Sequence, residues 1–344
     1  MTTGSTAQDW SLTEADYLRE RPARRSAYAY VLAAYLWFSA SVFWFKAVAH
    51  VSVWEVLAHR IIWSAVLLTA ILAVTGRLTI AVRVLRDRTT IITLAATSLL
   101  MGSSWYIYIW AVTHDCILET SLAYYISPLI KVLIGCIFLR EKLSAAQIAS
   151  VTLAFIGMII LGVSYGEIPI ISLGLAIISG LYGFMRKKVS VDATTGLAFE
   201  SLLLTPAALT FLLFLLHQEQ LAFAHKTPAT DLLLVAAGVI TAVPLVWYCN
   251  ALKRLPYSTI GLIMYIMPSM TFLIAIFVFD EPFGKTQLTT FCCAWAALLI
   301  YTYDSIRRDR MLRVNRIVSQ RDIQGDGISG VIGRIDGGHD RYRS

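Results

Sequence analysis

The stretch YYISPLIKVLIGCIFLREKLS, residues 124–144, returns 140 residues later as MYIMPSMTFLIAIFVFDEPFG, residues 264–284. In each stretch a Tyr lies three residues before a Pro, and a Glu follows that Pro by 13 residues: Tyr125, Pro128 and Glu141, then Tyr265, Pro268 and Glu281. Between residues 118–141 and 258–281, seven of 24 positions are identical without a gap. We infer that the chain contains an internal repeat.

The composition predicts a polytopic membrane protein. Of the 344 residues, 57% are hydrophobic, which is more than a soluble domain can cover with polar surface. Apolar runs of about 18–22 residues, long enough to cross a bilayer, recur along the chain. We predict ten spans, at 28–48, 53–75, 90–111, 117–139, 145–163, 170–185, 194–216, 231–252, 257–279 and 286–303.

The positive charges predict the orientation. With the N-terminus in the cytoplasm, 24 of the 29 Lys and Arg residues fall in inner loops or terminal segments. Positive charge concentrates on the cytoplasmic side of membrane proteins, so both termini are expected inside. The net charge of +7 is then explained by topology and by contact with anionic lipid, not by nucleic acid. Residues 304–344 are predicted to be a disordered cytoplasmic tail.

The repeat and the span count together predict the architecture. All ten spans pair at the 140-residue offset, so each repeat has five spans, and an odd number inverts the second repeat relative to the first. We divide the chain into an N-terminal cytoplasmic segment (1–26), a first five-helix repeat (27–163), a second, inverted repeat (164–303) and the tail (304–344). Inverted repeats are typical of secondary transporters that open a central site to each side in turn.

Several motifs also resemble a known family. The stretches WFKAVAHVSVWEVLAHRIIWS (44–64), SWYIYIWAV (104–112), ETSLAYYISPL (119–129), GFMRKKVSVDATTGLAFES (183–201) and YIMPSMTFLIAIFVFDEP (265–282) resemble the RarD subfamily of the EamA branch of the drug/metabolite transporter superfamily. The resemblance covers about residues 28–303. It implies a ten-helix permease of the bacterial inner membrane, in a family named for chloramphenicol sensitivity. Lys131 departs from the pattern, because relatives more often carry a neutral polar residue there.

The two repeated prolines are candidate hinges. Pro128 and Pro268 each lie about 11 residues into a span, near the bilayer midplane. A proline leaves a helical carbonyl unpaired, here those of Tyr124 and Met264, and kinks the helix. At this depth such backbone is tolerated only against protein or a wet cavity, so we place both prolines, with the hydroxyls of Tyr125 and Tyr265, on the substrate pathway. Ordinary packing kinks are the alternative.

Lys131 is the candidate for contact with a charged solute. A cation near the membrane centre costs about 2.5–3.5 kcal/mol on insertion scales, so it should face a cavity or a partner. It would attract an anionic or carboxylate-bearing solute, and its candidate partners by depth are tyrosines. The alternative is a side chain that snorkels to the cytoplasmic interface.

Other charged residues cluster at the ends of two helical hairpins and are candidates for gating or ion pairs. Lys46, Glu55, His59 and Arg60 lie at the outer end of the first hairpin, and Arg186 and Glu200 at the inner end of its counterpart. They either fix the hairpins or break and remake contacts as the halves rock. Glu119, at the outer start of the fourth span, is a candidate proton site because burial raises a carboxyl pKa. The alternative is a helix-start Glu stabilised by the helix dipole.

Aromatic residues complete the predicted pathway. Trp105 and Tyr108 in the third span, and Trp247 with Asn250 in the eighth, would suit a flat amphipathic solute. An aromatic belt and a helix-end asparagine are the alternatives.

These observations favour a transporter that moves a small amphipathic metabolite or drug by alternating access. We expect the direction of transport to be export. The sequence has no GxxxxGK[ST], HExxH or CxxC motif, so we expect no enzyme activity, cofactor or metal site. An integral membrane enzyme and a non-transporting receptor or scaffold are the alternatives. The expected partners are the lipid bilayer and a small-molecule substrate; proton coupling and a homodimer stay open.

Overall fold

The computed structural model describes residues 14–79, 87–113, 117–165, 170–279, 284–286, 288–304 and 307, with only the backbone described at 14–24, 109, 112–113, 117–121, 165, 275 and 279. Throughout this part of the chain the backbone forms helices joined by turns and short loops, with no strand. The predicted all-α class is therefore confirmed. The first 13 residues, the tail beyond residue 307 and Glu281 lie outside the described residues.

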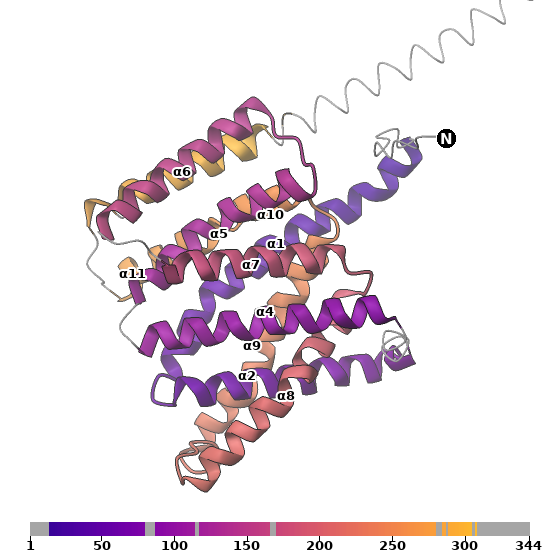
Figure 1. Ribbon diagram of the computed structural model, residues 1–344, viewed down its shortest axis with the longest axis vertical. Coiled ribbons are helices and arrows are strands. Elements are labelled where there is room, and N and C mark those ends of the chain that lie inside the picture. The colour runs from indigo at the N-terminus through magenta and orange to yellow at the C-terminus, as the bar shows by residue number, and fades with distance from the viewer. Residues whose placement is uncertain are drawn as a thin grey trace, which may run out of the picture.

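The helices follow one another closely along the chain (Figure 1). They are α1 (Glu14–Ala47), α2 (Val53–Val74), α4 (Arg88–Thr113), α5 (Ile117–Phe138), α6 (Ala145–Tyr165), α7 (Ile170–Lys188), α8 (Ala193–His217), α9 (Pro228–Leu252), α10 (Tyr257–Ile263) and α11 (Ile266–Phe279), and a last helix over residues 288–304. Each predicted span coincides with one of them, the ninth being divided between α10 and α11.

The helices have the length and composition that a membrane requires. Within the described ranges, eight helical stretches are long and apolar enough to cross a bilayer, with α10 and α11 counted as one. A shorter apolar helix covers Leu122–Phe138, and the helix over 288–304 coincides with the tenth predicted span. The architecture agrees with the predicted ten-helix membrane fold.

Polar residues fix where α8 and α9 begin. The Asp192 carboxylate accepts a hydrogen bond from the Thr195 amide at 3.0 Å, and the Thr227 hydroxyl accepts one from the Thr230 amide at 3.2 Å. Side chains of this kind satisfy amides that have no partner inside the first turn of a helix. Pro228 follows Thr227 as the first residue of α9, a position where a missing N–H costs nothing.

Helices from the two halves of the chain pack against each other. The helix α2 contacts α8 and α9, α5 contacts α7 and α10, and α1 contacts α9 and α11. The helix α6 lies beside the last helix at one edge of the molecule (Figure 1), where the Ser150 hydroxyl donates to the Ala297 carbonyl at 2.6 Å. Contacts between the halves therefore form the centre of the bundle.

The two repeated prolines have different local structures. Pro128 lies inside the continuous helix α5, whereas Pro268 follows a break at Met264 and Tyr265 that separates α10 from α11. The Met264 carbonyl, predicted to be unpaired, accepts a hydrogen bond from the Met267 amide at 2.9 Å. That prediction was wrong because a tight turn at the break supplies a donor that a continuous helix could not.

A glycine allows the close approach of α5 and α10. A Cβ atom built on Gly261 would lie 2.8 Å from the Pro128 carbonyl oxygen and 2.9 Å from Cβ of Lys131. Backbone atoms cannot move aside as the end of a flexible side chain can, so a larger residue would separate the two helices. Gly261 thus sets the distance between the repeated segments.

Candidate functional site

Lys131 lies in the interior, between three helical segments. Only 2% of its surface is exposed, and its ammonium Nζ donates to Ser179 Oγ of α7 at 3.0 Å. The same Nζ lies 3.1 Å from Sδ of Met264, at the break between α10 and α11. These partners differ from the predicted tyrosines, because depth along a helix does not show which neighbouring helix the side chain faces. Neither partner carries a negative charge, and the buried ammonium does not match a snorkelling side chain.

Tyr125 and Tyr265, paired by the repeat, are in direct contact. The Tyr265 hydroxyl donates to the backbone carbonyl of Tyr125 at 3.2 Å, and Tyr265 is 1% exposed. The Tyr125 ring packs edge-on against Phe291, with centroids 5.5 Å apart. Tyr265 therefore uses its hydroxyl to join the two repeated segments.

Arg60 extends from α2 into an aromatic environment. Its Nε donates to the Thr241 hydroxyl of α9 at 3.0 Å. Its guanidinium carbon lies 5.4 Å from the centroid of the Phe45 ring and 5.1 Å from that of Trp105. Tyr108 lies three residues beyond Trp105 in α4, so the two rings lie on the same face of that helix. No carboxylate among the residues that the structure describes forms an ion pair with Arg60.

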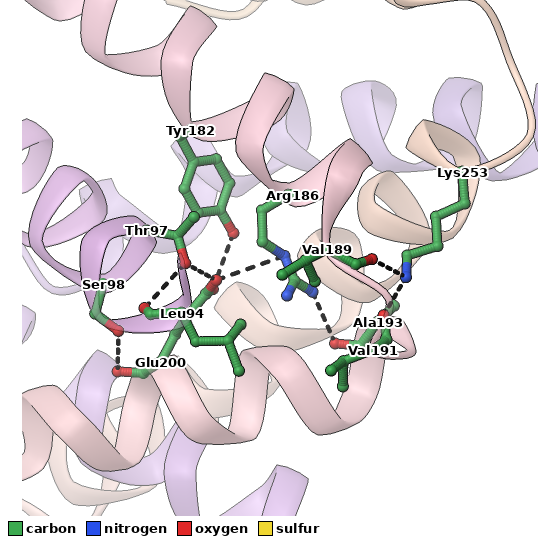
Figure 2. A network of polar contacts seen from close by, with 10 residues as sticks. All are labelled: Leu94, Thr97, Ser98, Tyr182, Arg186, Val189, Val191, Ala193, Glu200 and Lys253. Atoms are coloured by element: carbon green, nitrogen blue, oxygen red, sulfur yellow. Dashed lines mark hydrogen bonds and ion pairs between the residues drawn. The ribbon is translucent and has the colours of Figure 1, made fainter. Parts of the chain in front are cut away.

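Arg186 and Glu200 form a fully buried ion pair, with Nε and Oε1 separated by 3.5 Å (Figure 2). The Arg186 Nη2 group also donates to the Ala193 carbonyl at 3.2 Å. Gly196 makes room for the guanidinium, because a Cβ built there would overlap Nη1. A buried pair of this kind depends on further hydrogen bonds to offset the cost of removing both charges from water.

Glu200 obtains those hydrogen bonds from two other helices (Figure 2). The Thr97 hydroxyl of α4 donates to Oε1 at 2.5 Å, and the Tyr182 hydroxyl of α7 donates to Oε2 at 3.1 Å. The Ser98 hydroxyl donates to the Glu200 backbone carbonyl at 3.4 Å. The carboxylate of α8 thus joins α4 of the first half to α7 of the second.

Lys253 closes the loop beside this network. Its ammonium donates to the carbonyls of Val189 and Val191, between α7 and α8 (Figure 2). Partial burial, together with the nearby Arg186 charge, lowers the pKa of the Lys253 ammonium. The loop between α7 and α8 is therefore bound by Lys253, at the end of α9, and by Arg186 of α7, which donates to the Ala193 carbonyl.

Glu55 joins the two halves at the other end of the bundle. Its carboxylate is buried and accepts hydrogen bonds from the amides of Ala222, at 2.9 and 3.0 Å, and Phe223, at 2.9 Å. His59, four residues further along α2, has its Nε2 3.9 Å from Oε1. Trp63 Nε1 donates to His59 Nδ1 at 3.1 Å. Glu55 therefore binds the backbone between α8 and α9.

The remaining predicted residues lie apart from these groups. Lys46 is exposed, and Trp247 packs edge-on against Trp37 with centroids 5.8 Å apart. The Asn250 side-chain amide donates to the Val246 carbonyl of its own helix at 3.0 Å. The side chain of Glu119 lies outside the described residues.

Glu141 is a contact that sequence reasoning did not place in the site. Its carboxylate accepts hydrogen bonds from the Tyr257 amide at 2.6 Å, the Ser258 amide at 2.9 Å and the Ser258 hydroxyl at 2.6 Å. Two of these donors are amides at the start of α10, where a negative charge is stabilised. The signal was present in the sequence, since Glu141 stands at a fixed distance from Pro128 in the repeated phrase.

Comparison with known proteins identifies the family. The EamA-like transporter family matches the chain twice, over residues 25–163 and 168–303. The chain is 40% identical over 278 residues to the uncharacterized transporter YojE of Bacillus subtilis, covering 80% of this chain and 92% of YojE. It is 35% identical over 279 residues to the protein RarD of Escherichia coli, covering 81% of this chain and 94% of RarD.

Two further comparisons extend this result. The chloramphenicol-sensitive protein RarD of Pseudomonas aeruginosa is 32% identical over 257 residues, covering 74% of this chain and 85% of that protein. One protein of known crystal structure shares the fold with a TM-score of 0.63 at 18% identity, covering 82% of this chain and 98% of the other. The family description and the name of YojE indicate transport, which points away from catalysis. The chain is a multi-pass membrane protein that belongs to the EamA-like transporter family, and it has RarD proteins among its relatives.

Proposed function

We propose that this chain is a secondary transporter that moves a small, amphipathic, carboxylate-bearing solute by alternating access. One observation carries the proposal: the ammonium of Lys131 is buried at a contact between the two halves and has no carboxylate partner among the residues that the structure describes. A buried cation without a counter-charge is costly. A solute carboxylate would supply the missing charge at this place.

The contact between Tyr125 and Tyr265 supports the inverted repeat. Two residues related by a twofold axis can touch only if both lie near that axis. The Tyr265 hydroxyl is bonded to Tyr125, its counterpart at an offset of 140 residues. Lys131, less than two turns further along α5, therefore lies near the proposed axis, which is where transporters with inverted repeats bind their solutes.

Carboxylates at opposite ends of the bundle supply contacts that alternating access would break in turn. On the proposed inner side, Glu141 of the first half binds the start of α10 in the second half. On the proposed outer side, Glu55 of the first half binds the amides of Ala222 and Phe223. Release of one contact while the other is kept would open the bundle to one side only.

The orientation in the membrane is part of the proposal. Both termini are placed in the cytoplasm of a bacterial cell, with the protein in the inner membrane and export as the preferred direction. In a cysteine-free background, a cysteine beside Lys226 should react with an impermeant thiol reagent from outside, and one beside Lys187 should not. The reverse pattern would reject this orientation.

The relatives narrow the solute class only slightly. One relative is named for chloramphenicol sensitivity, which describes that protein. For this chain the name supports an amphipathic solute as the class to be tested. Lys131 adds a preference for acids over matched neutral molecules. Proton coupling through Glu119 remains a proposal.

Flux through proteoliposomes tests the proposed function. N-acetyltyrosine and N-acetyltyrosinamide form a suitable pair, because they differ in a carboxylate and an amide on the same aromatic body. The wild-type protein should move the acid faster than the amide, and Lys131→Asn should reduce that ratio. Lys142→Asn, which removes an exposed charge, is the matched control and should keep the ratio.

The outcomes also separate the alternative classes. A membrane enzyme would convert the solute, and a receptor or scaffold would leave it on its original side. Flux of both solutes at the rate of empty liposomes would reject transport of this solute class. An unchanged acid-to-amide ratio in Lys131→Asn would remove Lys131 from the site.

A further inference from the structure

Arg60 is a second cation within a helical span whose described contacts include no carboxylate, and it is partly buried. Its Nε donor is used by Thr241, and its guanidinium lies near the rings of Phe45 and Trp105. A guanidinium carries five N–H donors in one plane. The contacts that the structure describes for Arg60 leave its two terminal nitrogens without a hydrogen-bond acceptor.

Arg186 differs from Arg60 in having a carboxylate beside it, although its own Nε and Nη1 make no hydrogen bond within the part of the chain that the structure describes. Arg186 lies 3.5 Å from a carboxylate oxygen of Glu200 and also donates to a backbone carbonyl. Arg60 has a neutral hydroxyl and ring faces instead. Ring faces attract a cation but accept no hydrogen bond in the guanidinium plane. The donors of Arg60 are therefore oriented by its neighbours but not neutralised.

Arg60 lies well along α2, and its side chain is only partly buried. It lies seven residues after Val53, the first residue of α2, which corresponds to about 10 Å along the helix axis. Trp105 is partly buried beside it, and Tyr108 is 39% exposed. An aromatic surface next to an unneutralised guanidinium offers an apolar contact and a charged contact to one ligand.

We propose that Arg60, with Trp105 and Tyr108, forms a second subsite that binds the carboxylate of an aromatic acid. The terminal nitrogens hold the carboxylate in a two-point contact, the geometry for which arginine is suited and lysine is not. The aromatic body of the ligand packs on the Trp105 and Tyr108 rings. In the proposed transport cycle, which this inference extends, an acid would pass between Lys131 in the inner half of α5 and Arg60 in the outer part of α2.

Equilibrium binding to the full-length protein in detergent tests the subsite without any transport. A ligand that binds the folded state raises the melting temperature in a concentration-dependent way, so a dissociation constant can be obtained from the shift. N-acetyltyrosine should stabilise the wild-type protein and N-acetyltyrosinamide should not. Arg60→Gln should weaken binding of the acid about 10-fold or more, the expected effect of losing charged hydrogen bonds.

Two further variants keep the test decisive. Arg60→Lys retains the charge but loses the planar guanidinium, so its affinity for the acid should fall between those of the wild type and Arg60→Gln. If Arg60→Gln does not fold, Arg60→Lys serves as the test variant in its place. Arg88→Gln removes an exposed arginine at the start of α4 and should bind the acid like the wild type. Equal shifts by acid and amide, or wild-type affinity in the Arg60 variants, would overturn the assignment. Displacement of the acid by an equal concentration of inorganic phosphate would overturn it as well, by showing a general anion site.

The result is distinguishable from failure of the proposed function. Arg60-dependent binding of the acid without flux in liposomes would reject transport and leave the subsite standing. Flux of the acid with binding that does not depend on Arg60 would reject the subsite and leave transport standing.

Discussion

The substitution Glu200→Gln should destabilise the protein more than most single changes, because it leaves the guanidinium of Arg186 buried without a counter-charge. Thr97 and Tyr182 donate to different carboxylate oxygens, at 2.5 and 3.1 Å. Glutamine keeps one of these oxygens as an acceptor, and its NH2 group can donate to the other hydroxyl once that hydroxyl has rotated. The loss is therefore mainly the charge. Removal of one partner of a buried ion pair typically costs about 3–5 kcal/mol, and both side chains here are fully buried.

Removing the second charge should reverse most of this loss. In Arg186→Met combined with Glu200→Gln, no unpaired charge remains at this pair, and an apolar side chain of similar length occupies the space that Gly196 leaves. Replacement of a whole buried pair by uncharged residues is often neutral or stabilising. We expect the double variant to lie within about 1 kcal/mol of the wild type.

The free energy of unfolding can be measured by titration with SDS in mixed micelles, with far-ultraviolet circular dichroism as the readout. Glu219→Gln, a change at an exposed carboxylate, should stay within about 0.5 kcal/mol of the wild type. A loss below about 1 kcal/mol in Glu200→Gln would refute the reasoning. So would a double variant as unstable as the single one, because the cost would then not come from an unpaired charge.

Two other features of the bundle give predictions of the same kind. Pro128→Ala and Pro268→Ala each supply a missing N–H and should slow flux in proteoliposomes while the protein still inserts and folds. Flux at the wild-type rate in the double variant would show that both prolines are ordinary packing kinks and not hinges. Gly261→Ala should lower the free energy of unfolding by about 1–3 kcal/mol through overpacking against α5, whereas Gly174→Ala, where an added Cβ meets nothing within 4 Å, should not destabilise the protein.

The helices could be predicted from the sequence because apolar runs of bilayer length are a local signal. Each predicted span coincides with a described helix, and Glu55 and His59, which the sequence places in one cluster, lie close together. The ion pair of Arg186 with Glu200 agrees with one of the two alternatives left open for these residues, which lie on either side of a short loop. Local spacing was sufficient in all of these cases.

Contacts between helices distant in the chain could not be predicted. Thr97 lies 103 residues before Glu200, and Ser179 lies 48 residues after Lys131. These partners depend on which faces of two helices meet, and the uniformly apolar helices of a membrane protein give little periodic signal for that. The break between α10 and α11 was missed for a related reason, since Pro128 in the same motif leaves α5 continuous.

Exchange across the membrane tests alternating access most directly. Proteoliposomes loaded with labelled N-acetyltyrosine are diluted into buffer with or without the unlabelled acid outside, and efflux of the label is followed. Alternating access through the Lys131 site predicts that the external acid accelerates efflux in the wild type, and that Lys131→Asn weakens the acceleration. External acid speeds efflux only if the protein must return to its inward-facing state before it can export again. Equal efflux of the label with and without the external acid would therefore contradict the account and would indicate a continuous pore.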